Sequence, residues 1–233
     1  RQMCIRDRFQ DRNFSLAGAT ISTVGFAIST YIIPWMIYVQ TVQGFTPTEA
    51  ALLVLPSGVI SGLLSPWVGK LTNTHDPKPF AITGLTLAAA SMGASALITT
   101  PAVDPRWMYA VAVVYGVANS LMWGPLSMIA TRNLDPRLAG AGSSVYNTTR
   151  QIGAVIGSAA IAAMMSAQLA AKLGDGTGAG NMANTGQTTG PLPEALHEPF
   201  ALAMGNSIWL PCAVIAAGAV AACFFARTKS WND

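Results

Sequence analysis

Three groups of aromatic and amide side chains are spaced so that each group lies on one face of a helix. They are Tyr31, Trp35 and Tyr38; Tyr115, Asn119 and Trp123; and Asn147 with Gln151. Such rings and amides suit bulky apolar or cationic compounds, because stacking and cation–π attraction do not demand one ligand shape. We therefore expect all of them except Tyr38 to border a ligand cavity. The alternative roles are an interfacial belt for Tyr38 and hydrogen bonds between helices for Asn119 and Gln151.

The sequence does not indicate catalytic chemistry. His75 and His197 are the only histidines, and both fall in predicted connections between helices. No P-loop is present, and the glycine-rich run Gly174–Gly180 follows no strand. We expect a protein that is not an enzyme and that uses no metal or other cofactor.

Six apolar stretches supply the elements that must position these residues. They are Phe14–Tyr38, Ala50–Gly69, Phe80–Thr100, Trp107–Thr131, Val145–Ala171 and Asn206–Ala226. Each has 20 to 27 residues, enough to cross a hydrocarbon core of about 30 Å at about 1.5 Å per residue. Charged residues make up 10% of the chain, against roughly 25% in a soluble domain. The sequence predicts an all-α membrane protein with six transmembrane helices.

Lysine and arginine indicate how these helices are oriented. Alternate crossings place eleven of the thirteen basic residues on one face, and only Arg106 and Lys172 on the other. The ten acidic residues divide five and five. The positive-inside rule therefore predicts that both ends of this sequence are cytoplasmic. Because topology explains the net charge of +3, nucleic acid is not an expected partner.

Glycine and proline predict where helices approach one another and where they bend. The small-residue patterns Gly58–Gly62 and Gly153–Gly157 favour close contact between helices in lipid. We expect the second and fifth helices, which carry these patterns, to form an inner contacting pair. Gly124 and Pro125 predict a bend in the fourth helix with a role in gating.

Arg150 is a charged residue about one turn inside the predicted fifth helix. A charge at this depth is costly unless it is paired or reaches the membrane interface. The expected partners are Asp135 and the carbonyl groups at the end of the fourth helix. A simple positive-inside anchor is the alternative role.

The order of the helices suggests a duplicated unit. After a cytoplasmic lead-in (1–13), a first set of three helices (14–100) starts inside, and a second set (101–233) starts outside. This is the 3+3 inverted repeat of secondary transporters. The second set includes an external loop (172–205) and a cytoplasmic tail (227–233). Within the loop, the mildly amphipathic Leu192–Met204 is expected to lie along the membrane surface.

Four stretches of this sequence resemble the carboxyl-terminal half of a major facilitator superfamily transporter, and the nearest group is the fourteen-spanner drug:proton antiporters of bacteria. They are Phe9–Phe14, Gly44–Pro56, Pro66–Leu71 and Ala139–Gly153. The most specific part is Asn147–Gly153. Gly69 matches the leading glycine of the family's internal loop, and Lys78 retains one of its basic residues. Asn73 and Thr74 stand where the family has an acid and an arginine.

The resemblance implies proton-coupled multidrug efflux by alternating access in a bacterial plasma membrane. Hydrophobic or cationic small molecules and protons would be the cargo. The implied partners are the lipid bilayer and an amino-terminal transporter half. The third and sixth helices would be peripheral and face lipid. A permease for a lipid or other metabolite, a non-transporting membrane scaffold and a channel remain the alternatives.

Overall fold

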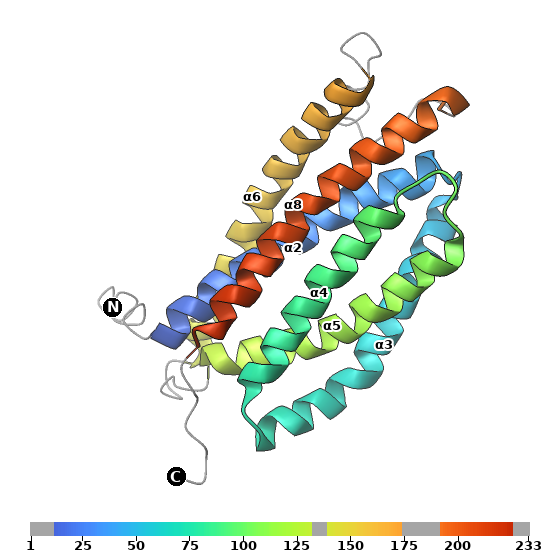
Figure 1. Cartoon of the computed structure of the whole chain (residues 1–233). Coiled ribbons are helices and arrows are strands. Elements are labelled where there is room, and N and C mark those ends of the chain that lie inside the picture. Colours follow the sequence, from blue (N-terminus) through green and yellow to red (C-terminus); the bar gives the residue numbers. More distant parts are fainter. Residues whose placement is uncertain (1–11, 132–138, 174–191, 226–233) are drawn as a thin grey trace.

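The computed structural model describes residues 12–131, 139–173 and 192–225, which form a bundle of long helices (Figure 1). The elements are α2 (Arg12–Thr41), α3 (Pro47–Thr74), α4 (Pro77–Ile98), α5 (Pro105–Thr131), α6 (Ala139–Leu173), the short 3-10 helix η3 (Glu194–Leu196) and α8 (His197–Cys223). Within the described ranges, six helices are long and apolar enough to cross a membrane. This confirms the predicted all-α fold with six spanning helices.

Local sequence signals explain where two of the helices begin. At the start of α3, the Thr46 hydroxyl accepts a hydrogen bond from the Glu49 backbone N–H at 3.3 Å. The Glu49 carboxylate in turn accepts one from the Thr46 backbone N–H at 2.8 Å, which completes a capping box. Asp76 caps α4 by accepting a hydrogen bond from the Lys78 backbone N–H at 3.1 Å. A proline follows each capping residue, as is common at the first helical position.

The last spanning helix begins nine residues before its predicted start, at His197. The expectation that Leu192–Met204 lies along the membrane surface is therefore wrong, because most of it forms η3 and the first turns of α8. Phe200 is only 2% exposed. A Cβ added at Gly205 would come within 3.0 Å of the Ala96 carbonyl oxygen of α4. Burial against neighbouring helices, rather than a membrane interface, accounts for this segment. Residues 174–191 of the predicted loop lie outside the described ranges.

The helices do not pack in chain order. α3 packs against α5, and α6 packs against α2. α4 and α8 pack against each other; in addition, α4 packs against α5, and α8 packs against α2. If α2 is exchanged for α5, α3 for α6 and α4 for α8, nearly the same set of helix pairs results. α2 and α5 run in opposite directions (Figure 1). A duplicated and inverted three-helix unit predicts this arrangement, although the unit boundaries at 14–100 and 101–233 stay a prediction.

Glycines decide which helices approach closely. A Cβ added at Gly153 would collide with the Ser22 carbonyl oxygen of α2, and one at Gly116 would lie 2.6 Å from the Ser57 carbonyl oxygen of α3. By contrast, a Cβ added at either end of the Gly58–Gly62 pattern would have nothing within 4 Å. The predicted contact between the second and fifth helices is therefore wrong. The glycines of α6 fit against α2, and α3 meets α5 instead.

The third and sixth spanning helices, α4 and α8, are extensively packed within the described bundle. A larger share of their apolar stretches is buried than in α3 or α6. Their glycines allow close approach, since a Cβ at Gly84 would lie 2.8 Å from the Leu121 backbone of α5. The small residues of α4 and α8 thus permit tight packing within this chain. Whether these two helices are peripheral and face lipid in a complete transporter stays a prediction.

Candidate functional site

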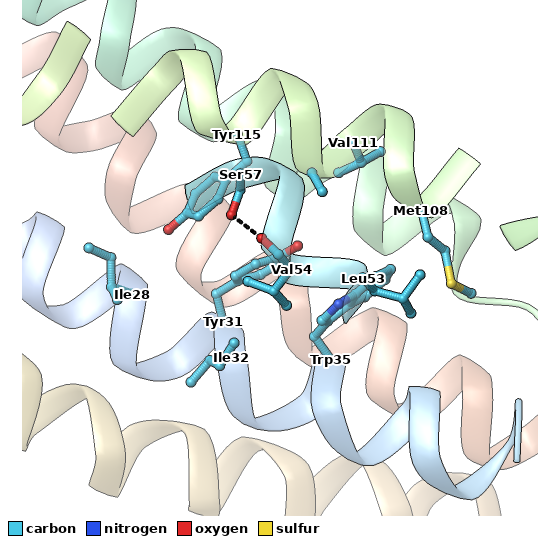
Figure 2. A pocket seen from close by; sticks show the side chains of 11 residues that line it. Ile28, Tyr31, Ile32, Trp35, Leu53, Val54, Ser57, Met108, Val111 and Tyr115 are labelled. Atoms are coloured by element: carbon cyan, nitrogen blue, oxygen red, sulfur yellow. Dashed lines mark hydrogen bonds between the residues drawn. The ribbon is translucent and has the colours of Figure 1, made fainter. Parts of the chain in front are cut away.

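A pocket of about 180 Å³ lies between α2, α3 and α5 (Figure 2). Its lining residues are Ile28, Tyr31, Ile32, Trp35, Leu53, Val54, Ser57, Met108, Val111, Ala112 and Tyr115. None of them is charged. A dry cavity of about 150 Å³ is enough to hold benzene, so the pocket is large enough for an aromatic ring with a small substituent. Three of the seven residues predicted to border a cavity, Tyr31, Trp35 and Tyr115, line this pocket.

The three rings form one aromatic cluster. Tyr31 and Trp35 are one turn apart on α2 and stack with centroids 6.2 Å apart and planes 16° apart. The contact between α2 and α5 brings the Tyr115 ring to 5.5 Å from that of Tyr31, at a 43° tilt. Tyr38 extends the cluster at the other end, with its ring centroid 5.9 Å from that of Trp35. Centroid separations in this range are favourable for aromatic pairs.

A buried serine on α4 fixes the orientation of Tyr31. The Tyr31 hydroxyl and the Ser95 hydroxyl are 2.8 Å apart. Ser95 donates its single hydrogen to the Ser91 carbonyl oxygen at 3.0 Å, so Tyr31 is the donor to Ser95. Sequence reasoning missed Ser95. The four-residue spacing of Ser91, Ser95 and Thr99 is the signal that marks one face of α4 as polar.

Asn119 and Trp123 lie further along α5 and do not line the pocket. The Asn119 amide donates to the Tyr115 carbonyl oxygen at 3.0 Å, and the Trp123 indole N–H donates to the Asn119 side-chain oxygen at 3.0 Å. Both hydrogen bonds stay within α5, so the hydrogen bonds described for Asn119 do not join two helices. The residues form a line that leads from Tyr115 toward one end of the bundle.

Arg150, on α6, contacts the last of these residues, Trp123. Its guanidinium carbon lies 5.7 Å from the centre of the Trp123 ring. Because α6 begins six residues before the predicted helix, Arg150 lies about three turns inside it rather than one. Among the described helices, it is the only charged side chain more than two turns from a helix end. The expected partner Asp135 falls outside the described residues.

The other predicted site residues are not brought into the pocket. Asn147 and Gln151 are exposed on α6, and the Asn147 amide donates to the Ser143 carbonyl oxygen of its own helix at 3.1 Å. A Cβ added at Gly69 or Gly124 would have nothing within 4 Å. The roles of these residues in a cavity or gate stay predictions.

Lys78 joins two helix ends on the face predicted to be cytoplasmic. Its ammonium group donates to the Phe225 carbonyl oxygen, just beyond the end of α8, at 2.7 Å. A cation at the carboxyl end of a helix is favourable, because the unpaired carbonyl groups there carry partial negative charge. Lys78 thus ties the start of α4 to the end of α8.

Comparisons with known proteins agree on one family. The profile of the Major Facilitator Superfamily matches residues 3–158. An uncharacterized MFS-type transporter of Mycobacterium tuberculosis is 39% identical over 219 residues, which are 93% of this chain and 38% of that protein. The multidrug resistance protein Stp of M. tuberculosis is 30% identical over 156 residues, 66% of this chain and 28% of that protein.

A third relative is the lincomycin resistance protein LmrB of Listeria monocytogenes. It is 28% identical over 125 residues, which are 53% of this chain and 26% of that protein. The chain therefore spans less than two-fifths of the length of the curated relatives that it matches here.

Proposed function

This chain belongs to the Major Facilitator Superfamily, and from that premise we propose that it is part of a transporter that exports drugs in exchange for protons by alternating access. The observation that carries the proposal is the uncharged pocket built around Tyr31, Trp35 and Tyr115. Aromatic walls without fixed charge suit hydrophobic or cationic small molecules. Two of the relatives are named for resistance to multiple drugs and to lincomycin, which supports the same class of cargo.

The proposal includes a second transporter half as partner. Large apolar side chains are exposed along α3 and α6, among them Leu63 (68%), Trp67 (74%) and Val155 (70%). We infer that the missing half covers these faces and completes the substrate cavity at the midplane of the membrane. The proposed location is a bacterial plasma membrane, with the Lys78 end of the bundle in the cytoplasm.

The proposed source of energy also lies in the partner half. No Asp or Glu occurs in the interior of a described spanning helix. Carboxylates are the usual proton carriers of membrane pumps and transporters. The protonated group that couples drug efflux to the proton gradient is therefore assigned to the second half.

A drug-resistance panel on the complete transporter tests this proposal. Tyr31→Leu and Tyr115→Ala should change resistance unequally between drugs at constant amounts of membrane protein. Trp107→Ala is the matched control, because Trp107 is 62% exposed and does not line the pocket. A loss of resistance that follows protein level for every drug would contradict the cavity, and unchanged resistance in both variants would contradict it as well.

A further inference from the structure

Four side chains bring polar atoms to the wall of the pocket, and two of them already donate their hydrogen within the protein. Tyr31 donates to Ser95, and the Ser57 hydroxyl donates to the Val54 carbonyl oxygen at 2.7 Å. The other two are the indole N–H of Trp35 and the hydroxyl of Tyr115. Neither donates a hydrogen bond to any residue that the structure describes.

Trp35 lines the pocket, and its indole nitrogen is drawn among the other lining side chains (Figure 2). Trp35 as a whole is only 4% exposed. Among the described residues, the buried side-chain polar atoms without a hydrogen-bond partner are the hydroxyls of Thr20 and Tyr146 alone. The unpartnered Trp35 nitrogen is not one of them, so it retains accessible surface. The surface that Trp35 contributes is the pocket wall, where its ring is seen among the other lining residues (Figure 2).

Two neighbouring rings restrict the Trp35 ring and with it the direction of its N–H. Tyr31 stacks on the Trp35 ring, and the Tyr38 ring packs against it at a tilt. An indole N–H only donates, whereas a tyrosine hydroxyl rotates and can also accept. Of these two groups, the N–H of Trp35 is therefore the one whose direction is set by the fold.

Because the pocket wall carries no charge, a neutral ligand gains more from the Trp35 donor than a cation does. No lining residue carries a charge, so a cation would lose its hydration without meeting an anion. It would also meet the positive end of the Trp35 N–H dipole, which opposes the attraction of the rings for cations. A neutral molecule loses little hydration, and an acceptor atom on it would satisfy the N–H.

We propose that this pocket takes a neutral lipophilic molecule whose acceptor oxygen or nitrogen receives a hydrogen bond from the Trp35 indole N–H. The inference rests on the proposed function in treating the pocket as part of the substrate path. It narrows the proposed cargo from hydrophobic or cationic compounds to neutral hydrogen-bond acceptors. It also makes Trp35 a determinant of specificity.

Three probes of nearly one shape test the inference by equilibrium binding to the 233-residue chain in lipid nanodiscs. Acetophenone presents a carbonyl acceptor, α-methylstyrene replaces that oxygen with CH₂, and 1-phenylethylammonium replaces it with a cation. Dissociation constants from ligand-observed NMR, corrected with empty nanodiscs, should show acetophenone binding about three- to tenfold more tightly than α-methylstyrene, the span expected for one hydrogen bond. The ammonium probe should bind more weakly than either.

Substitutions assign the preference to a residue. Trp35→Phe retains a ring and removes the N–H, so the ratio between the two neutral probes should fall to about one. Trp107→Phe, outside the pocket, is the control and should leave the ratio unchanged. Tyr115→Phe removes only the other hydroxyl of the wall, so the ratio should stay well above one. Using the ratio cancels effects of ring size, which act on both neutral probes alike. Because the hydrocarbon probe partitions into lipid more strongly than the ketone, each dissociation constant is first referred to that probe's own partitioning into empty nanodiscs.

Several outcomes would overturn the inference. If acetophenone and α-methylstyrene bind equally well to the wild-type chain, the inference is wrong. This result needs no variant, so it holds even if Trp35→Phe fails to fold. Loss of the ratio in Tyr115→Phe but not in Trp35→Phe would remove Trp35 from the role, and tighter binding of the ammonium probe would reverse the ligand class. Each of these leaves the proposed drug transport standing, because that is tested by resistance in the complete transporter.

Discussion

The guanidinium of Arg150 on α6 lies over the indole ring of Trp123 on α5, 5.7 Å from its centre. α5 and α6 share few other contacts, so this pair is a main link between them. The Trp123 N–H is held by the Asn119 side chain, which fixes the ring that Arg150 covers. The sequence predicted an acidic partner for Arg150. Among the described residues, a cation–π contact with Trp123 stabilises its charge.

The first prediction concerns the charge of Arg150. Arg150→Ala should lower drug transport by the complete protein, whereas Arg150→Lys should retain part of it, because an ammonium group still interacts with an aromatic face. The measurement is initial transport rate at matched amounts of membrane protein. Equal rates in wild type and both variants would identify Arg150 as a topological anchor only.

The second prediction concerns Asn119 and Trp123. Trp123→Ala should change resistance unequally between drugs, and Asn119→Ala should shift it in the same direction but less, because Asn119 acts by orienting the indole. A drug panel with quantified protein levels measures both. If Trp123 only fills space, its truncation should instead cost about 3–5 kcal/mol of stability, and resistance should fall uniformly with expression.

The third prediction compares a tight glycine with an open one. Gly153→Ala should lower the free energy of unfolding of the chain in detergent by about 1–3 kcal/mol, because the added methyl group collides with the Ser22 carbonyl oxygen. Gly62→Ala has open space and should be neutral or stabilise by up to about 1 kcal/mol through helix propensity. Thermal or denaturant unfolding measures both. Similar destabilisation by the two variants would contradict the packing described for α6 and α2.

The fourth prediction concerns the link between α4 and α8. Lys78→Met should weaken the end of α8 by about 0.3–1 kcal/mol, because the Phe225 carbonyl oxygen loses its cationic donor. Lys78→Arg should retain much of the effect. Hydrogen exchange of the last turn of α8 reports the change, with Lys172→Met, at the exposed end of α6, as the control. Unaltered exchange in Lys78→Met would show that the contact adds no stability.

The fifth prediction concerns energy coupling. Reconstituted alone in liposomes, residues 1–233 should not move a dye in response to a proton gradient, because no described helix interior contains a carboxylate. Transport should appear when the chain is produced together with the proposed second half. Proton-driven uptake by the chain alone would place the proton carrier within it.

The sequence by itself determined the elements and much of the chemistry. Six apolar runs, in which Arg150 is the only charged residue, are long enough to span a membrane. Helical spacing puts Tyr31 and Trp35 on one face because both belong to the same helix. The capping signals of Thr46 and Asp76 act within a single turn, so local sequence is sufficient to read them. Tyr115 was also predicted, since its ring belongs to the aromatic and amide face of α5.

Only the tertiary structure decided which helices meet. The patterns Gly58–Gly62 and Gly153–Gly157 look alike in sequence, yet one is open and the other receives the backbone of α2. Likewise, Ser95 reaches Tyr31, and Arg150 reaches Trp123, across long separations in the chain. Helical periodicity fixes the direction of a side chain relative to its own axis. The neighbour that it meets depends on how distant helices fit together in shape, and that fit is a property of the packed bundle.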